Sequence, residues 1–319
     1  MIENVRLLAR QQHQVRIAAE RAGAERLRGL LTQAQRQLAQ KLRLADLLGA
    51  PDAPFSALQL QLIHAEARIV LRSLKRHFRD LILAQARTMS RAQASILLAH
   101  LQRSGSQVNS RDRARLFEKI VVGVRAGALQ RVDKGLLDRY SRRLTRKFEQ
   151  HLRALMATQQ PWRKVRQELI DAPLFAQAPA QRMADRYLRT ELAYAANRSG
   201  HESASAFDEN LGGGVLRVLV AVLDGRTYGD SANVHGEVRR PGEPFEYVAD
   251  DGTHRRFMHP PDRPNDRGFI VLWHRDWGPI PAELHPLSDS EVQSYYASKK
   301  RKFHGRPRVM STVEVTYAS

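Results

Sequence analysis

The sequence predicts an α+β protein, with an elongated, mainly helical N-terminal half followed by a small α+β domain that contains an irregular antiparallel sheet. Apolar residues recur at spacings of three and four through most of residues 1–160, which indicates helices. Short β-type runs separated by turn residues follow residue 212. Helices in one part of a chain and strands in another are typical of the α+β class.

The helical half divides into three long apolar stripes. They extend over residues 27–48, 56–102 and 137–155, and a glycine and a proline end the first of them. Ser56 is a residue type that caps helix starts, so we expect the second helix to begin there. Apolar stripes of this length need partner helices, and the sequence therefore predicts a bundle.

The second half carries one more helix and several strands. The helix is predicted over 179–206, and the β-type runs cover 215–223, 243–248, 254–258 and 269–273. The turn Asp250-Asp251-Gly252 between two of these runs predicts a hairpin. The expected domains are a basic helical bundle or rod (1–160), an α+β domain (161–298) and a basic C-terminal arm (299–319).

Positive charge is concentrated in the first half. The chain has 52 Lys and Arg against 33 Asp and Glu, a net charge of +19, and residues 1–160 carry +18 of it. Such a charge opposes folding unless an anionic partner relieves it. Nucleic acid, an anionic membrane face and an acidic protein surface all satisfy this requirement, and the charge alone leaves the three open.

Two rows of basic residues lie beside apolar stripes at helical spacing. They are Arg72, Lys75, Arg76 and Arg79 in one helix and Arg139, Arg142, Arg143 and Arg146 in another. A solvated helix face is the plain interpretation of a single row, whereas two rows in a strongly basic half favour contact with phosphates. The sequence has no base-reading module and no aromatic residues spaced for stacking, so we expect sequence-independent contact with double-stranded DNA.

Signals for catalysis and for cofactors are weak. The chain has no cysteine, which excludes thiolate nucleophiles and Cys-ligated metal sites. A cluster drawn from His235, His254, His259 and His274 with Asp224, Asp230 or Asp266 could hold a metal ion, but no pair has a tight ligand spacing. We therefore expect no catalytic residue, cofactor, metal or small-molecule substrate. The apolar runs are too short for a membrane span, and no membrane partner is expected.

Three motifs stand in a characteristic order in the second half. Arg189-Thr190-Glu191 lies in a predicted helix, Asp224-Gly225-Arg226-Thr227 precedes His235-Gly236, and Pro260-Pro261 is followed by Pro264-Asn265-Asp266-Arg267. Over about residues 180–275 this order resembles the Mu F-like minor head proteins of the phage head-morphogenesis family. The resemblance marks these residues as a structural motif: Arg189, Glu191, Asp224, Arg226, His235, Gly236, Pro260, Pro261, Pro264, Asn265, Asp266 and Arg267.

Many members of that family carry cysteines that look like a zinc knuckle, and this chain departs from the pattern. The corresponding positions hold Tyr228, Ser231, Arg263, Asp266 and Gly268. The resemblance therefore implies a member without metal. Its final turn would be held by proline stiffness and by polar contacts among Asp224, Arg226, Asp266 and Arg267.

The resemblance implies a minor capsid protein of a tailed phage that acts in head assembly, DNA ejection or both. Its partners would be the portal protein, with the major capsid protein as a further candidate, and packaged DNA. Its location would be the virion, inside the capsid near the portal, and the host cytoplasm during assembly. Two alternatives remain open: a metal-dependent phage nuclease using His235, His259, Asn265 and His274, and a helical scaffold or adaptor with an acidic protein partner.

Overall fold

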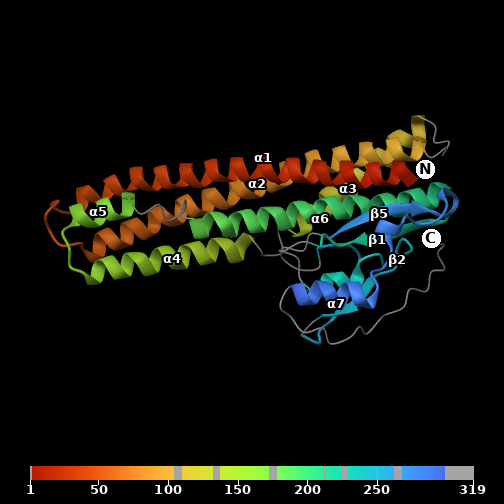
Figure 1. Ribbon diagram of the computed structural model, residues 1–319. Coiled ribbons are helices and arrows are strands. Elements are labelled where there is room, and N and C mark those ends of the chain that lie inside the picture. The colour runs from red at the N-terminus through yellow and green to blue at the C-terminus, as the bar shows by residue number, and fades with distance from the viewer. Residues whose placement is uncertain are drawn as a thin grey trace. The chain divides into compact units, whose positions relative to one another are not determined.

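The structure is a computed structural model that describes residues 2–103, 110–131, 137–171, 178–211, 213–223, 229–249, 251–261 and 268–298 (Figure 1). Its helices are α1 (Ile2–Leu42), α2 (Ala57–Arg103), α3 (Ser110–Arg131), α4 (Leu137–Ala157), α5 (Trp162–Asp171), α6 (Ala178–Leu211) and α7 (Asp289–Ser298). Its strands are β1 (Val215–Val220), β2 (Val238–Arg239), β3 (Phe245–Val248), β4 (His254–Phe257) and β5 (Phe269–His274). The predicted α+β class is confirmed.

The chain divides into two compact units that are each assembled from separate stretches. Unit 1 contains Met1–Glu20, Gln85–Ala128 and Arg189–Ser319, and unit 2 contains Arg21–Ala84 and Leu129–Leu188. The sequence analysis instead expected consecutive domains with a boundary at residue 160. The difference arises because α1, α2 and α6 each supply residues to both units, and periodicity does not show where a continuous helix changes partners. The predicted C-terminal arm lies outside the described residues.

Unit 2 is a helical bundle built on the predicted apolar stripes. Phe78 of α2 and Phe148 of α4 are among its fully buried side chains. The ring of Phe78 packs edge-on against Tyr140 of α4 and Tyr187 of α6, with centroid distances of 5.7 and 5.5 Å. The predicted stripes therefore face a shared core, and burial of large aromatic side chains stabilises the bundle by about 2 to 3 kcal/mol per side chain.

The start of α2 follows from one serine. The Ser56 Oγ accepts a hydrogen bond from the Gln59 backbone N–H at 3.2 Å, and the Ser56 backbone N–H donates to the Gln59 Oε1 at 3.0 Å. This reciprocal arrangement is a capping box, and its hydroxyl is worth about 1 kcal/mol. The Gln59 Nε2 also donates to the carbonyl of Ala45, which ties α2 to the short 3-10 helix η1 (Arg43–Leu48).

Unit 1 contains the sheet and the hairpin. The sheet has the antiparallel order β2-β1-β5, with Val218 of β1 opposite Val238 on one side and Val271 on the other. All six residues of β1 are buried. The predicted hairpin is confirmed as β3 paired with β4, with Phe245 opposite Phe257.

Asn197 ties α6 to β5 in the same unit. Its side-chain amide donates to the Gly268 carbonyl at 2.9 Å, and its Oδ1 accepts from the Ile270 N–H at 3.0 Å. The sequence did not predict α5, α7 or β2, which are short. None of the helices in the described ranges is long and apolar enough to cross a membrane.

Candidate nucleic-acid interface

The first predicted basic row lies on α2, beside its buried stripe. Leu71, Leu74 and Phe78 are buried, while Arg72 and Arg76 are exposed. Lys75 and Arg79 are half-buried, and each takes part in an interaction within the structure. The row therefore presents two exposed arginines, together with two cations that the bundle partly covers.

The second predicted row lies on α4 and is exposed throughout. Tyr140, Leu144 and Phe148 form the buried side of this helix. The exposed members of the row are Arg139, Arg142, Arg143 and Arg146. Together with Arg72 and Arg76 they make six exposed arginines, none of which forms an ion pair with a described side chain.

Two contacts show that α2 and α4 are antiparallel neighbours. Phe78 packs against Tyr140, and ten residues earlier in α2 the Arg68 guanidinium lies 3.5 Å from the carboxylate of Glu149, which is nine residues after Tyr140 in α4. Both helices rise by about 1.5 Å per residue. The basic residues therefore stand at matching levels, in the pairs Arg72 and Arg146, Lys75 and Arg143, Arg76 and Arg142, and Arg79 and Arg139.

The Arg68–Glu149 ion pair also identifies the flank on which the two helices meet. At about 100° per residue, the four basic residues of α2 lie within about 80° of Arg68. On α4, Arg142, Arg146 and Arg139 lie about 20°, 60° and 80° from Glu149, whereas Arg143 lies about 120° away. We call the combined surface the basic seam, which consists of Arg72, Lys75, Arg76, Arg79, Arg139, Arg142 and Arg146.

The charge balance of unit 2 supports an anionic ligand for the basic seam. Unit 2 holds 24 Lys and Arg against 11 Asp and Glu, so +13 of the net charge of +19 lies in this unit. Several of its carboxylates already contact cations, since Asp46 pairs with Arg166, Glu66 with Lys41 and Glu149 with Arg68. Burial and the nearby Asp185 raise the pKa of Tyr140, so the phenol of this residue stays neutral at pH 7 beneath the basic seam.

The motif residues of the second half are only partly described. Arg189 is exposed and Glu191 is buried, as expected for neighbours two apart on a helix, and both have partners in the structure. Pro260 and Pro261 are buried and joined by a cis peptide bond. Six other motif positions lie outside the described residues, namely Asp224, Arg226, Pro264, Asn265, Asp266 and Arg267.

His235 and Gly236 shape a tight turn in unit 1. The His235 Nδ1 accepts from the Ala221 N–H at 3.2 Å, and its Nε2 lies 3.3 Å from the Glu283 carbonyl. Burial lowers the pKa of His235, so its ring is neutral near pH 7. Gly236 has φ of +76°, and a Cβ there would lie 2.2 Å from the backbone of His285. This motif therefore serves packing.

The histidines considered for a metal site do not converge. The His259 Nδ1 lies 2.8 Å from the Pro260 carbonyl, the His274 Nε2 lies 3.0 Å from the Gly213 carbonyl, and His254 is exposed. Within the described residues, no group of three or more His, Asp or Glu side chains is arranged to hold a metal ion. The side chains of Asp224, Asp230 and Asp266 are outside the described set.

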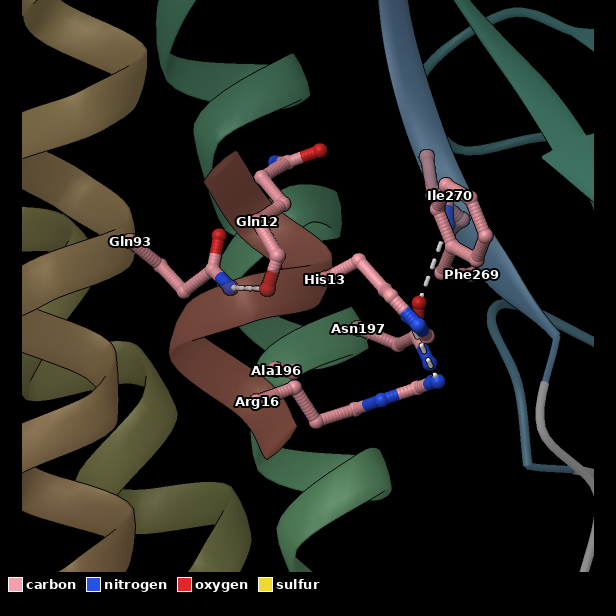
Figure 2. A pocket seen from close by; sticks show the side chains of 8 residues that line it. All are labelled: Gln12, His13, Arg16, Gln93, Ala196, Asn197, Phe269 and Ile270. Carbon is pink, nitrogen blue, oxygen red and sulfur yellow. Dashed lines mark hydrogen bonds between the residues drawn. The ribbon is translucent and has the colours of Figure 1, made fainter. Parts of the chain in front are cut away.

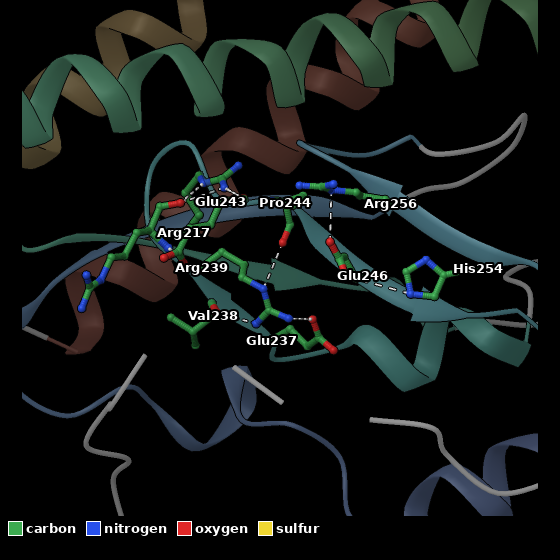
Figure 3. Close-up of polar contacts among 10 residues, drawn as sticks. Arg217, Glu237, Val238, Arg239, Glu243, Pro244, Glu246, His254 and Arg256 are labelled. Atoms are coloured by element: carbon green, nitrogen blue, oxygen red, sulfur yellow. Dashed lines mark hydrogen bonds and ion pairs between the residues drawn. The ribbon is translucent and has the colours of Figure 1, made fainter. Parts of the chain in front are cut away.

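A buried arginine that the sequence analysis missed organises the α+β unit (Figure 3). Arg217 of β1 is 0% exposed, and its guanidinium donates to the carbonyls of Arg240, Glu243 and Met258. The charged head therefore joins β1 to the turn before β3 and to the end of β4. Burial lowers the pKa of Arg217 to about 10, which still leaves it charged at neutral pH. A lone arginine in an otherwise apolar strand is the signal that could have found it.

Further polar contacts surround this guanidinium. The Arg217 Nη1 lies 3.1 Å from the His201 Nδ1, and burial together with Arg217 lowers the pKa of His201 to about 4. Arg239 of β2 donates to the Pro244 carbonyl and pairs with Glu237 at 2.9 Å (Figure 3). Both arginines also lie over the Phe245 ring, at 5.1 and 5.9 Å from its centroid. These contacts fasten the hairpin to the sheet.

A small pocket in unit 1 lies between α1, α2, α6 and β5 (Figure 2). It is lined by Gln12, His13, Arg16, Gln93, Ala196, Asn197, Phe269 and Ile270. Its volume of about 20 Å³ is enough for about one water molecule. The pocket is therefore too small for a substrate, and the basic seam remains the stronger candidate site.

Comparisons with known proteins do not identify the chain: no family model, no curated protein and no solved structure matches it.

Proposed function

We propose that the protein binds double-stranded DNA without sequence preference through the basic seam. The observation that carries this proposal is the exposure of arginines at matching levels on two antiparallel helices joined by the Arg68–Glu149 pair. Guanidinium groups suit phosphate oxygens, and displacement of condensed counterions makes such contacts favourable without base readout. A surface formed by two helix flanks can meet several phosphates at once.

We further propose that this binding belongs to a minor head protein of a tailed phage. The motif order around Arg189, His235 and Pro260 supports this role through its resemblance to the Mu F-like family. In such a particle, unit 1 would dock on the portal or the inner capsid, and unit 2 would lie against packaged DNA. The network around Arg217 suits a docking module, because its hydrogen bonds hold the hairpin rigidly.

Gel-shift measurements on the full chain test the DNA contact. Two duplexes of equal length and unrelated sequence should bind with the same affinity, and added salt should weaken both equally. A preference for one duplex, or no binding at low salt, contradicts the proposal. Cleavage of either duplex in the presence of Mg²⁺, Mn²⁺ or Zn²⁺ would instead favour the nuclease alternative.

Co-purification tests the particle assignment separately. The protein should remain with purified phage particles through density-gradient centrifugation. After the DNA is released from the particles, a portal-docked protein should stay with the empty shells. Its complete absence from particles would refute the head-protein role while leaving the DNA contact intact.

A further inference from the structure

Four exposed leucines gather at the junction between α1 and α2. Seven large apolar side chains in the described ranges are exposed, and four of them lie in η1 or in the first turn of α2. Leu47 is 82% exposed, and Leu58, Leu44 and Leu48 are 56%, 40% and 37% exposed. The hydrogen bond from Gln59 to the Ala45 carbonyl holds the two segments together. We call these four residues the leucine tip.

The turn that carries the leucine tip is firmly fastened within unit 2. Asp46 of η1 accepts hydrogen bonds from the Trp162 Nε1 at 2.7 Å and from the Arg166 guanidinium at 2.5 Å. The Trp162 backbone N–H donates to the Ala53 carbonyl, and Phe55 stacks on the Trp162 ring at 5.5 Å. The leucines therefore project from an ordered turn, and their exposure follows from the packing of its other side.

Cations surround the leucine tip. Arg43 directly precedes Leu44 and is exposed. Arg163 and Lys164, also exposed, lie in the first turn of α5, which the bond from the Arg163 N–H to the Pro51 carbonyl holds beside the tip. The carboxylate of Asp46 is engaged by Arg166, and the exposed carboxylate of Asp52 lies 3.6 Å from the Arg163 guanidinium in a solvent-exposed ion pair. The tip thus combines protruding apolar side chains with a basic surround.

The amount of exposed surface favours one kind of partner. The four exposed fractions add up to about two complete leucine side chains. A stable protein interface buries about 800 Å² on each partner, far more than two leucines supply, so neither a second copy nor another protein is held by this patch alone. A lipid surface, by contrast, accepts individual leucines at the headgroup boundary while its anionic headgroups attract neighbouring cations.

We propose that the leucine tip inserts into the surface of a bilayer containing anionic lipids, with Arg43, Arg163 and Lys164 contacting the headgroups. This contact is peripheral and needs no spanning helix. It departs from the expectation, drawn from the sequence, that the protein has no membrane partner. It is also separate from DNA binding, because none of its residues belongs to the basic seam.

Because the chain lacks cysteine, a single Leu47→Cys substitution gives one labelling site on the full-length protein. The label would be a fluorophore whose emission shifts in an apolar environment. Vesicles of phosphatidylcholine with about one third phosphatidylglycerol should shift its emission to the blue, and pure phosphatidylcholine should do so much less. Val122→Cys, at a position in α3 that is 60% exposed, is the matched control and should show no shift. A Leu47 label that never responds to anionic vesicles overturns the proposal.

A paired substitution separates apolar insertion from general charge attraction. Leu44→Ser with Leu47→Ser leaves every charge in place, and so does the control pair Ile69→Ser with Val122→Ser, which removes exposed apolar residues elsewhere. In about 0.5 M salt, charge attraction is screened. The affinity for anionic vesicles, measured by co-sedimentation, should then fall at least tenfold for the first pair and less than twofold for the second.

The proposal would be overturned if both pairs of substitutions reduced vesicle binding equally. It would also be overturned if the protein formed a dimer without lipid and the dimer depended on Leu47. Thermal unfolding and DNA binding should be unchanged in the Leu44/Leu47 variant. If the wild-type protein failed to bind DNA but still bound anionic vesicles, the proposed function would be refuted and the lipid contact would stand.

Discussion

Alanine at Arg72, Arg76, Arg142 and Arg146 removes four exposed guanidinium groups from both sides of the basic seam. None of the four is buried or ion-paired with a described side chain, so the bundle should keep its stability. The stripe beneath them, including Phe78 and Phe148, is untouched. The variant therefore isolates the surface charge from the fold.

The geometry gives the expected size of the effect. On α2 the seam extends over eight residues, from Arg72 to Arg79, and the seven steps between them span roughly 10 Å at 1.5 Å per residue. A duplex carries one charge per 1.7 Å, so about six phosphates lie along that length, and about three face the protein. Three contacts predict a slope of about −2.7 in log affinity against log salt, which is about a 40-fold loss between 50 and 200 mM.

The four substitutions should therefore reduce the magnitude of the slope by about 2 and weaken binding at 50 mM salt by at least tenfold. Fluorescence anisotropy of a labelled duplex, titrated at several salt concentrations, measures both quantities. The matched control replaces Arg21, Arg26, Arg28 and Arg36 by alanine. These are exposed arginines of α1 in the same unit, and their loss lowers the net charge by the same four units.

The control should change the slope by less than one unit. Equal losses in the two variants would mean that total charge, and not the arrangement of the basic seam, drives binding. A slope near zero for the wild-type protein would refute phosphate contact itself.

Three further predictions concern unit 1. Arg217→Met removes a fully buried guanidinium that donates to three backbone carbonyls, so the free energy of unfolding measured in urea should fall by about 3 to 5 kcal/mol; an unchanged value would refute the organising role of this guanidinium. The pKa of His201, lowered to about 4, means that the unfolded chain binds a proton between about pH 6.5 and 4 while the folded protein does not. The free energy of unfolding should therefore fall by about 1 to 2 kcal/mol as the pH is lowered from about 6.5 to 4. His201→Asn should flatten the pH dependence of the melting temperature. Gly236→Ala should cost at least about 2 kcal/mol, because its Cβ would collide with the His285 backbone; Gly242→Ala, with a similar positive φ but open space, is the control and should cost less.

Local features of the sequence were sufficient for much of the fold. The capping role of Ser56, the buried stripe through Phe78 and the hairpin that pairs Phe245 with Phe257 each depend on residues close together in the chain. Short elements such as α5 were missed, because the helical spacing of its buried Trp162, Val165 and Leu169 extends over only ten residues. The anchor of α5 is Trp162, whose partner Asp46 is distant in the sequence.

The candidate site shows the same limit. Both basic rows could be located from their spacing, but the spacing assigned phosphate contact equally to all eight residues. The packing of Phe78 on Tyr140 and the Arg68–Glu149 pair place Arg142 and Arg146 nearest the α2 row and leave Arg143 farther around α4. Arg217 was missed because its acceptors come from residues 240–258, and a strand sequence does not indicate which distant carbonyls will surround it.

The amino-acid sequence alone determined the class of fold, the long helices and the unequal distribution of charge, since each is a property of neighbouring residues or of composition. Tertiary structure decided which arginines share a surface, how continuous helices are divided between two units, and how a charged side chain is satisfied inside a sheet. The reason is physical: periodicity records which face of an element avoids water, but only packing selects what covers that face and at which level two elements meet.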